Sequence, residues 1–299
     1  MSLLAPFSLP GHWYRGILHV HSTASDGERS SDDVFAWYRS QGYHFVALTD
    51  HDVLSQARSI GPDLIALSGI EIEGIDPASG IYHLVGLGLD RPPDLEVWQV
   101  LPLQEAVDRM ATVARLVVMA HPYWSGQKST DLLPIERCSI LEVYNGGCEV
   151  DDCKGYSNVH WDDLLAAGKS WWGLAVDDAH WRDGTKDAGL GWVWVKAPAL
   201  TAADLLTALE QGHFYASAGP ELLGVEIEGR RVHVRCSPAV AVDFVGNGPF
   251  CRRVSAAAGQ TLTEAAHQLH SLQTYLRVAV CDVAGNWAWS NPVFVEPGD

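Results

Sequence analysis

Histidine and carboxylate residues recur along the chain at the ends of apolar runs, in types and spacings that suit metal binding. The first motif is Leu18-His19-Val20-His21, where an extended backbone directs both imidazoles to one side. Asp26 follows in a Ser-Asp-Gly turn, and His51 stands in Thr-Asp-His-Asp after an apolar run. A lone His-x-His is more often a pair of core residues, so its meaning depends on the residues that follow.

Five more residues of the same chemistry come later in the chain. They are Glu71 in Gly-Ile-Glu-Ile-Glu, His83, His121 in Ala-His-Pro, and Asp178 and His180 in Asp-Ala-His. Imidazole and carboxylate donors without a thiolate suit Zn, Mn or Fe rather than Cu(I) or an iron–sulfur cluster. One tetrahedral ion cannot use so many donors, so the pattern predicts two to three divalent metal ions.

Short apolar runs alternate with amphipathic stretches over the first two thirds of the chain. The runs are nearly continuous, which is typical of strands buried on both faces. The predicted strands are Ile17–Val20, Phe45–Thr49, Leu64–Ser68, Tyr82–Leu87, Leu116–Ala120, Ile140–Tyr144, Gly173–Val176 and Trp192–Val195. Helices are predicted from the Ser30 cap to Gly42 and over Gln104–Arg115, Trp161–Ala167 and Ala202–Gln211. This α/β pattern indicates a parallel barrel or a doubly wound sheet.

The pattern changes after Gly219-Pro220. Val225 and Ile227 alternate with polar residues, Gly229-Arg230 can form a turn, and Val232 and Val234 alternate back, which predicts a hairpin. Further strands are predicted over Val240–Val245, Tyr275–Val280 and Val293–Val295. We therefore expect residues 220–299 to form a small antiparallel β domain without catalytic groups, beside a first domain of residues 1–219.

Composition narrows the classes of partner. The chain has 299 residues, 47% of them hydrophobic, and a formal net charge of −17. The hydrophobic content is high enough to form a packed core. The negative charge disfavours long nucleic acid as a partner, because the phosphate backbone is also negative. The six cysteines form no Cys-x-x-Cys pair, which predicts free thiols. No signal peptide or membrane span is evident, so we expect a cytoplasmic protein, while the oligomeric state is not indicated.

Taken in order, the motifs resemble those of the polymerase and histidinol phosphatase (PHP) superfamily. The resemblance covers roughly residues 14 to 195 and implies a distorted (β/α)7 barrel. It implies a first metal held by His19, His21, Glu71 and Asp178. Glu71 would bridge to a second metal held by His83 and His121, and Asp26, His51 and His180 would hold a third. Many relatives have histidine where Asp26 stands. Four later segments resemble the subgroup that includes a carbaryl hydrolase: Ala120–Gly126, Val143–Cys148, Asp177–Trp181 and Gly212–Pro220.

The resemblance favours a phosphoesterase that uses a metal-bridging hydroxide on a small-molecule phosphate ester. Asp178 and His180 would then be catalytic, and Asp177 would orient a ligand or relay a proton, unless it is an unpaired surface carboxylate. Arg182 is the best placed of the few basic residues to bind phosphate.

Two alternatives remain open. A carbamate, ester or amide hydrolase acting on an aryl substrate would use the aromatic cluster that includes Trp124 and Tyr144, although such residues are often core. The other alternative is a metal-stabilised binding domain without catalysis. We also expect Tyr215 and Ser217 to approach the metals, because a last β-α unit closing a barrel would bring them beside the first strand.

Overall fold

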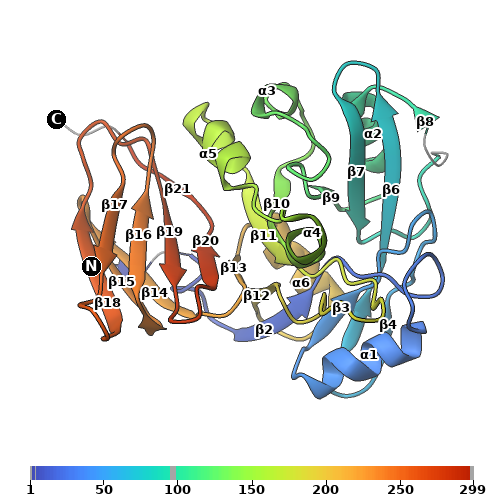
Figure 1. The fold of residues 1–299 in the computed structure, drawn as a ribbon, viewed down its shortest axis with the longest axis horizontal. Helices are drawn as coiled ribbons and strands as arrows, with labels where there is room; N and C mark the ends of the chain where they lie inside the picture. Colours follow the sequence, from blue (N-terminus) through green and yellow to red (C-terminus); the bar gives the residue numbers. More distant parts are fainter. Residues whose placement is uncertain (1, 4, 95–98, 297–299) are drawn as a thin grey trace.

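The computed structural model describes residues 2–3, 5–94 and 99–296. Figure 1 shows two regions side by side. Most of the chain up to α6 (Ala202–Glu210), coloured blue to yellow, forms the right-hand region of mixed strands and helices. The C-terminal strands, orange and red, form a β region on the left, where the N-terminus also lies.

A long mixed sheet runs through both regions. β2 (His12–Ile17), β3 (Phe45–Ala47) and β5 (Ile65–Leu67) are parallel neighbours, although β2 ends where the predicted strand Ile17–Val20 begins. β12 (Trp192–Ala197) and β13 (Phe214–Ser217) extend them antiparallel. The sheet then continues into the end of the chain, because Ala216 of β13 pairs with Trp289 of β20. Its strands are, in order, β17 (Arg252–Ser255), β16 (Ala241–Val245), β19 (Tyr275–Cys281), β20 (Trp287–Ser290), β13 (Phe214–Ser217), β12 (Trp192–Ala197), β2 (His12–Ile17), β3 (Phe45–Ala47), β5 (Ile65–Leu67) and β4 (Arg58–Ser59), with β21 (Val293–Phe294) paired to β19.

The remaining strands of the right-hand region form a second sheet. β9, β10 and β11 are parallel, whereas β7 is antiparallel to both β6 and β9. Its order is β11 (Trp172–Val176), β10 (Ile140–Asn145), β9 (Leu116–Met119), β7 (Gly80–Leu87), β6 (Gly69–Asp76) and β8 (Gln99–Val100). β6 and β7 form a hairpin whose turn ends at Gly80, with φ at 89°, a conformation that glycine adopts without steric cost.

The α/β class is confirmed, but no closed barrel is found among the described residues. Isolated bridges link the two sheets near the histidines, between Val20 and Ala179, between His51 and Glu71 and between Ser55 and Gly69, and β11 also lies close to β12 and β13. A ring of repeated β-α units would make all neighbours parallel. The β6–β7 hairpin breaks that rule, so the strands form two sheets that converge where the histidines lie.

The helices follow the sequence prediction in part. Ser30 caps the first helix by accepting a hydrogen bond from the Asp33 amide at 3.2 Å, and Val34 and Tyr38 are buried. The helix predicted over Gln104–Arg115 ends at Met110, and α4 was not predicted. The helices are α1 (Ser31–Ser40), α2 (Leu103–Met110), α3 (Ser129–Leu132), α4 (Gly146–Asp152), α5 (Asn158–Ala166) and α6 (Ala202–Glu210).

The C-terminal strands are antiparallel, and the predicted hairpin is present. Val225 of β14 pairs with Val234 of β15, and Gly229 at the turn has φ at 57°. A third sheet contains β1 (Ser2–Leu3), β14 (Leu222–Glu228), β15 (Arg231–Ala239) and β18 (Leu262–Gln268). Ser2–Leu3 was expected in the first domain, but backbone pairing with β14 places it in the C-terminal sheet.

The two regions share more than a linker. The guanidinium of Arg277 in β19 donates to both oxygens of Asp162 in α5 at 2.7 and 2.6 Å, and it lies over the Trp161 ring at 5.0 Å. The pairing of β13 with β20 crosses residue 219, so the predicted boundary does not coincide with a break in the sheet. The division into residues 1–219 and 220–299 remains a prediction.

Candidate metal centre

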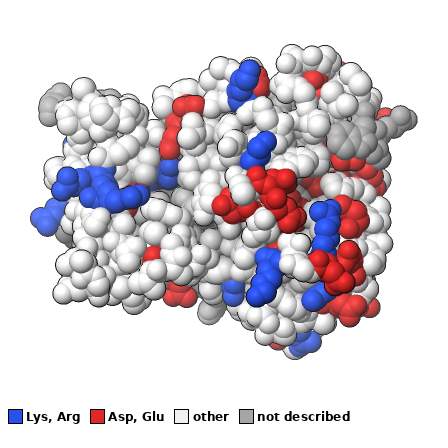
Figure 2. Space-filling view, viewed as in Figure 1, with Lys and Arg blue, Asp and Glu red and all other residues white. Residues whose placement is uncertain are grey.

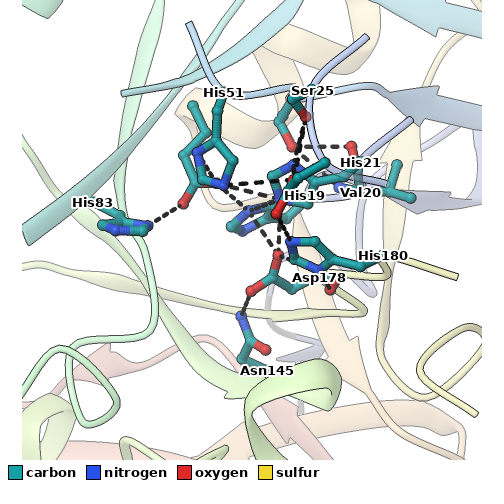
Figure 3. A network of polar contacts seen from close by, with 12 residues as sticks. His19, Val20, His21, Ser25, His51, His83, Asn145, Asp178 and His180 are labelled. Atoms are coloured by element: carbon teal, nitrogen blue, oxygen red, sulfur yellow. Dashed lines mark hydrogen bonds and ion pairs between the residues drawn. The ribbon is translucent and has the colours of Figure 1, made fainter. Parts of the chain in front are cut away.

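The structure brings all nine predicted metal-binding residues into one cluster, at the carboxyl ends of β2, β3, β9 and β11 and beside the β6–β7 hairpin. Figure 3 shows the imidazoles of His19, His21, His51, His83 and His180 turned toward one another and toward Asp178. They come from segments that follow β2, β3 and β11 and from β7. Loops at this end of parallel strands converge, which explains how residues so far apart in sequence meet.

Glu71 lies at the centre of the cluster and is 1% exposed. Its Oε2 is 3.1 Å from His19 Nε2 and 3.3 Å from His21 Nε2. Its Oε1 is 2.9 Å from His83 Nδ1 and 3.3 Å from His121 Nε2. The two oxygens of one carboxylate therefore face two separate sets of imidazoles.

Asp178 completes the more buried of these sets. Its Oδ1 is 3.1 Å from His19 Nε2 and 2.9 Å from His21 Nε2. His19, His21, Glu71 and Asp178 each offer an atom within 4.8 Å of the others. A second such group is formed by His51, Glu71 and His83.

A third group surrounds Asp26 at the more open side of the cluster. Its Oδ2 is 3.2 Å from His180 Nε2, and its Oδ1 is 3.6 Å from His21 Nδ1 and 3.8 Å from His51 Nε2. The His21 ring stacks on His180 at 4.2 Å and on His51 at 4.6 Å. These four residues also offer atoms within 4.8 Å of one another.

Two members of the cluster have strained backbones. His121 has φ at 27° and Asp178 has φ at 54°, in the left-handed region that side chains other than glycine rarely adopt. Hydrogen bonds hold both conformations, because the His121 amide donates to Glu142 Oε2 at 2.8 Å and the Asp178 amide donates to the His19 carbonyl at 3.0 Å. Such strain persists where the surrounding structure fixes a functional geometry.

The charges of the cluster are strongly coupled. Burial by itself lowers the pKa of His21, but hydrogen bonds and charge from Asp178 and Glu71 outweigh it and raise the pKa to about 9. Burial raises the pKa of Glu71, yet His19 and His83 hold it well below the usual range. The buried carboxylates thus need positive charge beside them. Divalent cations would supply that charge with the imidazoles neutral, so the donor set fits metal binding.

Sequence reasoning missed Glu142, which is 1% exposed and follows the strand position Leu141 in β10. Its Oε1 is 2.6 Å from His19 Nδ1, and its Oε2 accepts from the His121 amide and from Asn145 Nδ2, each at 2.8 Å. A carboxylate on Nδ1 fixes the imidazole so that Nε2 faces the cluster. Glu142 could have been found from the sequence, because it is a charged residue within the apolar run Ile140–Tyr144.

Asn145 connects the cluster to α4. Its Nδ2 donates to Asp178 Oδ2 at 3.1 Å as well as to Glu142, and its Oδ1 accepts from the Cys148 amide at 2.9 Å as the helix cap. Figure 3 shows this side chain beneath Asp178. The start of α4 is therefore held by the same network that positions two of the predicted metal ligands.

Asp177 is not the surface carboxylate that the sequence left possible, since it is fully buried. It accepts a hydrogen bond from the Tyr38 hydroxyl at 2.6 Å and from the Gly189, Leu190 and Gly191 amides at 2.7 to 2.8 Å. Burial raises its pKa to about 6 despite these donors. Its oxygens hold the chain after His180 rather than face the cavity.

The cluster forms the floor of a cavity of about 250 Å³. Of the four predicted substrate residues, Trp124 and Arg182 line it and Tyr144 and Ser217 do not. The lining residues are Asp26, His51, Glu71, Glu73, His83, His121, Trp124, Gly147, Cys148, Asp151, Asp152, Asp178, His180 and Arg182. Figure 2 shows acidic side chains gathered over α4, beside this cavity, and basic ones over the C-terminal strands.

The expectation that Tyr215 and Ser217 approach the metals is wrong. The Ser217 hydroxyl is buried and donates to the Pro220 carbonyl at 2.7 Å, and Tyr215 packs against Trp13 with ring centroids 5.4 Å apart. Tyr144 stacks on Trp289 at 5.9 Å. β13 continues into the C-terminal sheet instead of closing a barrel, so Tyr215 and Ser217 pack in the core rather than at the metals.

Two further expectations from sequence can be compared with the structure. All six cysteines are free, as predicted. None of the helices in the described part of the chain is both long and apolar enough to cross a bilayer.

Comparisons with known structures agree with the predicted resemblance. No family profile matches the chain. The fold is similar to a two-domain protein from Bacteroides vulgatus that is described as containing a predicted PHP-like metal-dependent phosphoesterase, with a TM-score of 0.54 and 15% identity. The similarity covers 99% of this chain and 96% of that one. The resemblance to PHP-type proteins is confirmed in the fold, while the carbaryl-hydrolase subgroup stays a prediction.

Two curated proteins are similar over shorter segments. A 5'-3' exoribonuclease of Haemophilus influenzae is 38% identical over 81 residues, which are 25% of this chain and 28% of that protein. A phosphoribosyl 1,2-cyclic phosphate 1,2-diphosphodiesterase of Eggerthella lenta is 37% identical over 79 residues, 24% of this chain and 30% of that protein. The chain thus spans less than a third of the length of these relatives.

Proposed function

We propose that this protein is a metal-dependent hydrolase that cleaves a small-molecule phosphate ester. The observation that carries the proposal is the cluster of nine imidazole and carboxylate residues around Glu71, seven of which line one cavity. The names of the curated relatives, both enzymes that act on phosphodiester bonds, support hydrolysis at phosphorus. One of them is a nuclease, so the exclusion of long nucleic acid continues to rest on the negative charge of this chain.

The residues divide into two or three sites for divalent ions, with zinc, manganese or iron suited to the donors. His19, His21, Glu71 and Asp178 would hold the first. The second would be held by Glu71 with His83 and His121, and His51 also comes within reach, since its Nδ1 is 3.4 Å from Glu71 Oε2. Asp26, His51 and His180 would hold the third, with His21 beside them.

Bound divalent ions supply Lewis acidity, which lowers the pKa of water and offsets negative charge that develops on the phosphoryl oxygens. Hydrolysis of a phosphate ester adds water to phosphorus, breaks the bond to the ester oxygen and transfers a proton to the leaving oxygen. Arg182 is the one Lys or Arg among the cavity residues described, and its guanidinium is 3.5 Å from Asp26 Oδ2. It is therefore placed to bind a phosphoryl oxygen beside the cluster.

Asp178 and His180 are the proposed catalytic residues of this chain, because each faces the cavity as well as a carboxylate or imidazole partner. Asp177 is a positioning residue. It fixes the backbone at Gly189 and Gly191, and its own carbonyl accepts from the Gly147 amide at 2.7 Å. No contact among the described residues favours the carbamate hydrolase or the binding domain over this proposal.

The test is elemental analysis of the purified protein followed by a side-by-side activity screen after loading with zinc, manganese or iron. The panel contains a phosphomonoester, a phosphodiester, an aryl ester and an aryl carbamate. We expect more than one equivalent of metal per chain and turnover of the phosphate esters. One equivalent or less after loading would contradict the multinuclear site, and turnover of the carbamate or carboxylic ester alone would replace the proposed substrate class.

A further inference from the structure

Trp124 forms an organised part of the cavity wall. It lies between β9 and α3 and is half-buried. Its indole contacts the imidazoles of His121 and His83 edge to face, with ring centroids 5.0 and 5.4 Å apart. Its Nε1 donates to Asp152 Oδ2 at 2.8 Å, at the last residue of α4. The ring is therefore fixed at one side by the metal-site histidines and at the other by α4.

The rest of the wall limits the charge that a substrate can carry. Asp151, Asp152 and Glu73 line the cavity with the metal-site carboxylates, and Arg182 is the one cationic Lys or Arg side chain among the described lining residues. That guanidinium is already close to two carboxylates, at 3.5 Å from Asp26 and 3.9 Å from Asp151. Beyond the phosphate itself, a second anionic group would meet unbalanced carboxylates.

We propose that Trp124 is a specificity-determining residue that binds the leaving group, and that the substrates are phosphate esters whose leaving group is flat and uncharged. This inference rests on the proposed function. Trp124 is the one aromatic side chain other than histidine among the described residues that line the cavity. A flat leaving group can pack on the indole while the phosphate occupies the cluster beneath it. Asp152 orients the indole and repels anionic leaving groups.

The experiment measures kcat/KM of the metal-loaded full-length protein for phenyl phosphate, methyl phosphate and 4-carboxyphenyl phosphate. The variants are Trp124→Ala, Trp124→Phe and Asp152→Asn, each with its metal content determined. Tyr123→Ala is the matched control, because Tyr123 is the adjacent residue and is 44% exposed but does not line the cavity. Comparing ratios between variants cancels the intrinsic reactivity of each ester.

We expect Trp124→Ala to lower the phenyl-to-methyl ratio roughly fivefold to tenfold, and Trp124→Phe to retain most of it. Asp152→Asn should raise the ratio of 4-carboxyphenyl to phenyl phosphate about threefold, since it removes one negative charge at the wall. Tyr123→Ala should leave both ratios unchanged. Such a pattern would establish the indole and the Asp152 charge as determinants of the leaving group.

An unchanged phenyl-to-methyl ratio in fully metal-loaded Trp124→Ala would overturn the inference while leaving the proposed function intact. Failure of the unmodified protein to hydrolyse any of the three esters would instead overturn the proposed function. If Trp124→Ala loses metal, the inference is tested by the ratio of kcat/KM for 4-carboxyphenyl and phenyl phosphate in Asp152→Asn. An increase supports the inference, and an unchanged ratio overturns it.

Discussion

The region around the cavity and the C-terminal strands differ in which residues adopt a left-handed backbone conformation. In the described chain up to residue 219, residues other than glycine adopt positive φ at Asp52, His121, Arg137, Cys153, Asp178 and Trp181. From residue 220 to residue 296, positive φ occurs only at glycine. Two of these six residues, His121 and Asp178, belong to the cluster, where hydrogen bonds hold the strained conformation, whereas the C-terminal strands turn at residues that tolerate the conformation without cost.

Burial of charge shows the same contrast. His19, Glu71 and Glu142 are almost completely buried around the cavity and depend on one another for their charge balance. Among the described C-terminal residues, Arg277 is the one charged side chain that is buried, and it is paired with Asp162. We therefore expect changes at the buried charges around the cavity to act on metal binding, and changes at the contacts of the C-terminal strands to act on stability alone.

The largest effect is expected from Glu71→Ala. The substitution removes the carboxylate that faces two sets of imidazoles, so at least one equivalent of metal should be lost. Activity should fall on the order of 10³-fold, because Lewis acidity contributes several kcal/mol to the transition state. Elemental analysis and kcat measure the two effects. The matched control is Glu264→Ala on β18, where the glutamate is exposed. Retained metal and turnover in Glu71→Ala would mean that the cluster is not the catalytic site.

Glu142→Ala should have the next largest effect, although Glu142 does not line the cavity. Loss of a carboxylate that orients a metal-binding imidazole typically costs 10- to 100-fold in metal affinity or activity. Glu142→Gln keeps an oxygen that can accept from His19 Nδ1 and should recover part of the loss. Metal affinity of the two variants is measured by competition with a chelator. Equal affinity in Glu142→Ala and the unmodified protein would show that the 2.6 Å contact has no positioning role.

The contact between α5 and β19 should affect stability but not chemistry. Asp162→Ala leaves the buried Arg277 without its ion-pair partner, and we expect a loss of about 2 kcal/mol in the free energy of unfolding. The value is below that for a fully buried pair, because the Asp162 side chain is 31% exposed. Denaturant unfolding measures the change in stability, and kcat/KM of the metal-loaded protein measures the change in activity. A large fall in activity at unchanged stability would connect the C-terminal strands to catalysis.

The smallest effect is expected on the outer face of the C-terminal strands. Arg253 and Asp243 form a bidentate pair at 2.6 Å, but the Arg253 side chain is 58% exposed. Arg253→Ala should therefore cost about 1 kcal/mol or less in unfolding free energy, with activity unchanged. It is the surface counterpart of Asp162→Ala. If the two variants lost equal stability, burial of Arg277 would not explain the effect of the first.

Much of the candidate site could be predicted from the sequence, because metal-binding chemistry is restricted to few residue types. The nine residues chosen from their type and spacing lie together in the structure. His51, His121 and Asp178 could be placed at strand ends because polar residues after apolar runs mark the position where buried strands emerge. Trp124 and Arg182 were found by their nearness in sequence to such motifs. Ser217 was misplaced because its position depended on a closed barrel.

The sequence by itself determined the donor set, the position of most strands and the change to an antiparallel pattern near residue 220, since these depend on residue type and local periodicity. Only the tertiary structure decided that β6 and β7 form a hairpin between two sheets, and that the long sheet continues from β13 into β20. It also decided that Glu142 and Asn145 orient the ligands. Strand partners and contacts between distant side chains depend on the packing of the whole chain, which local patterns do not encode.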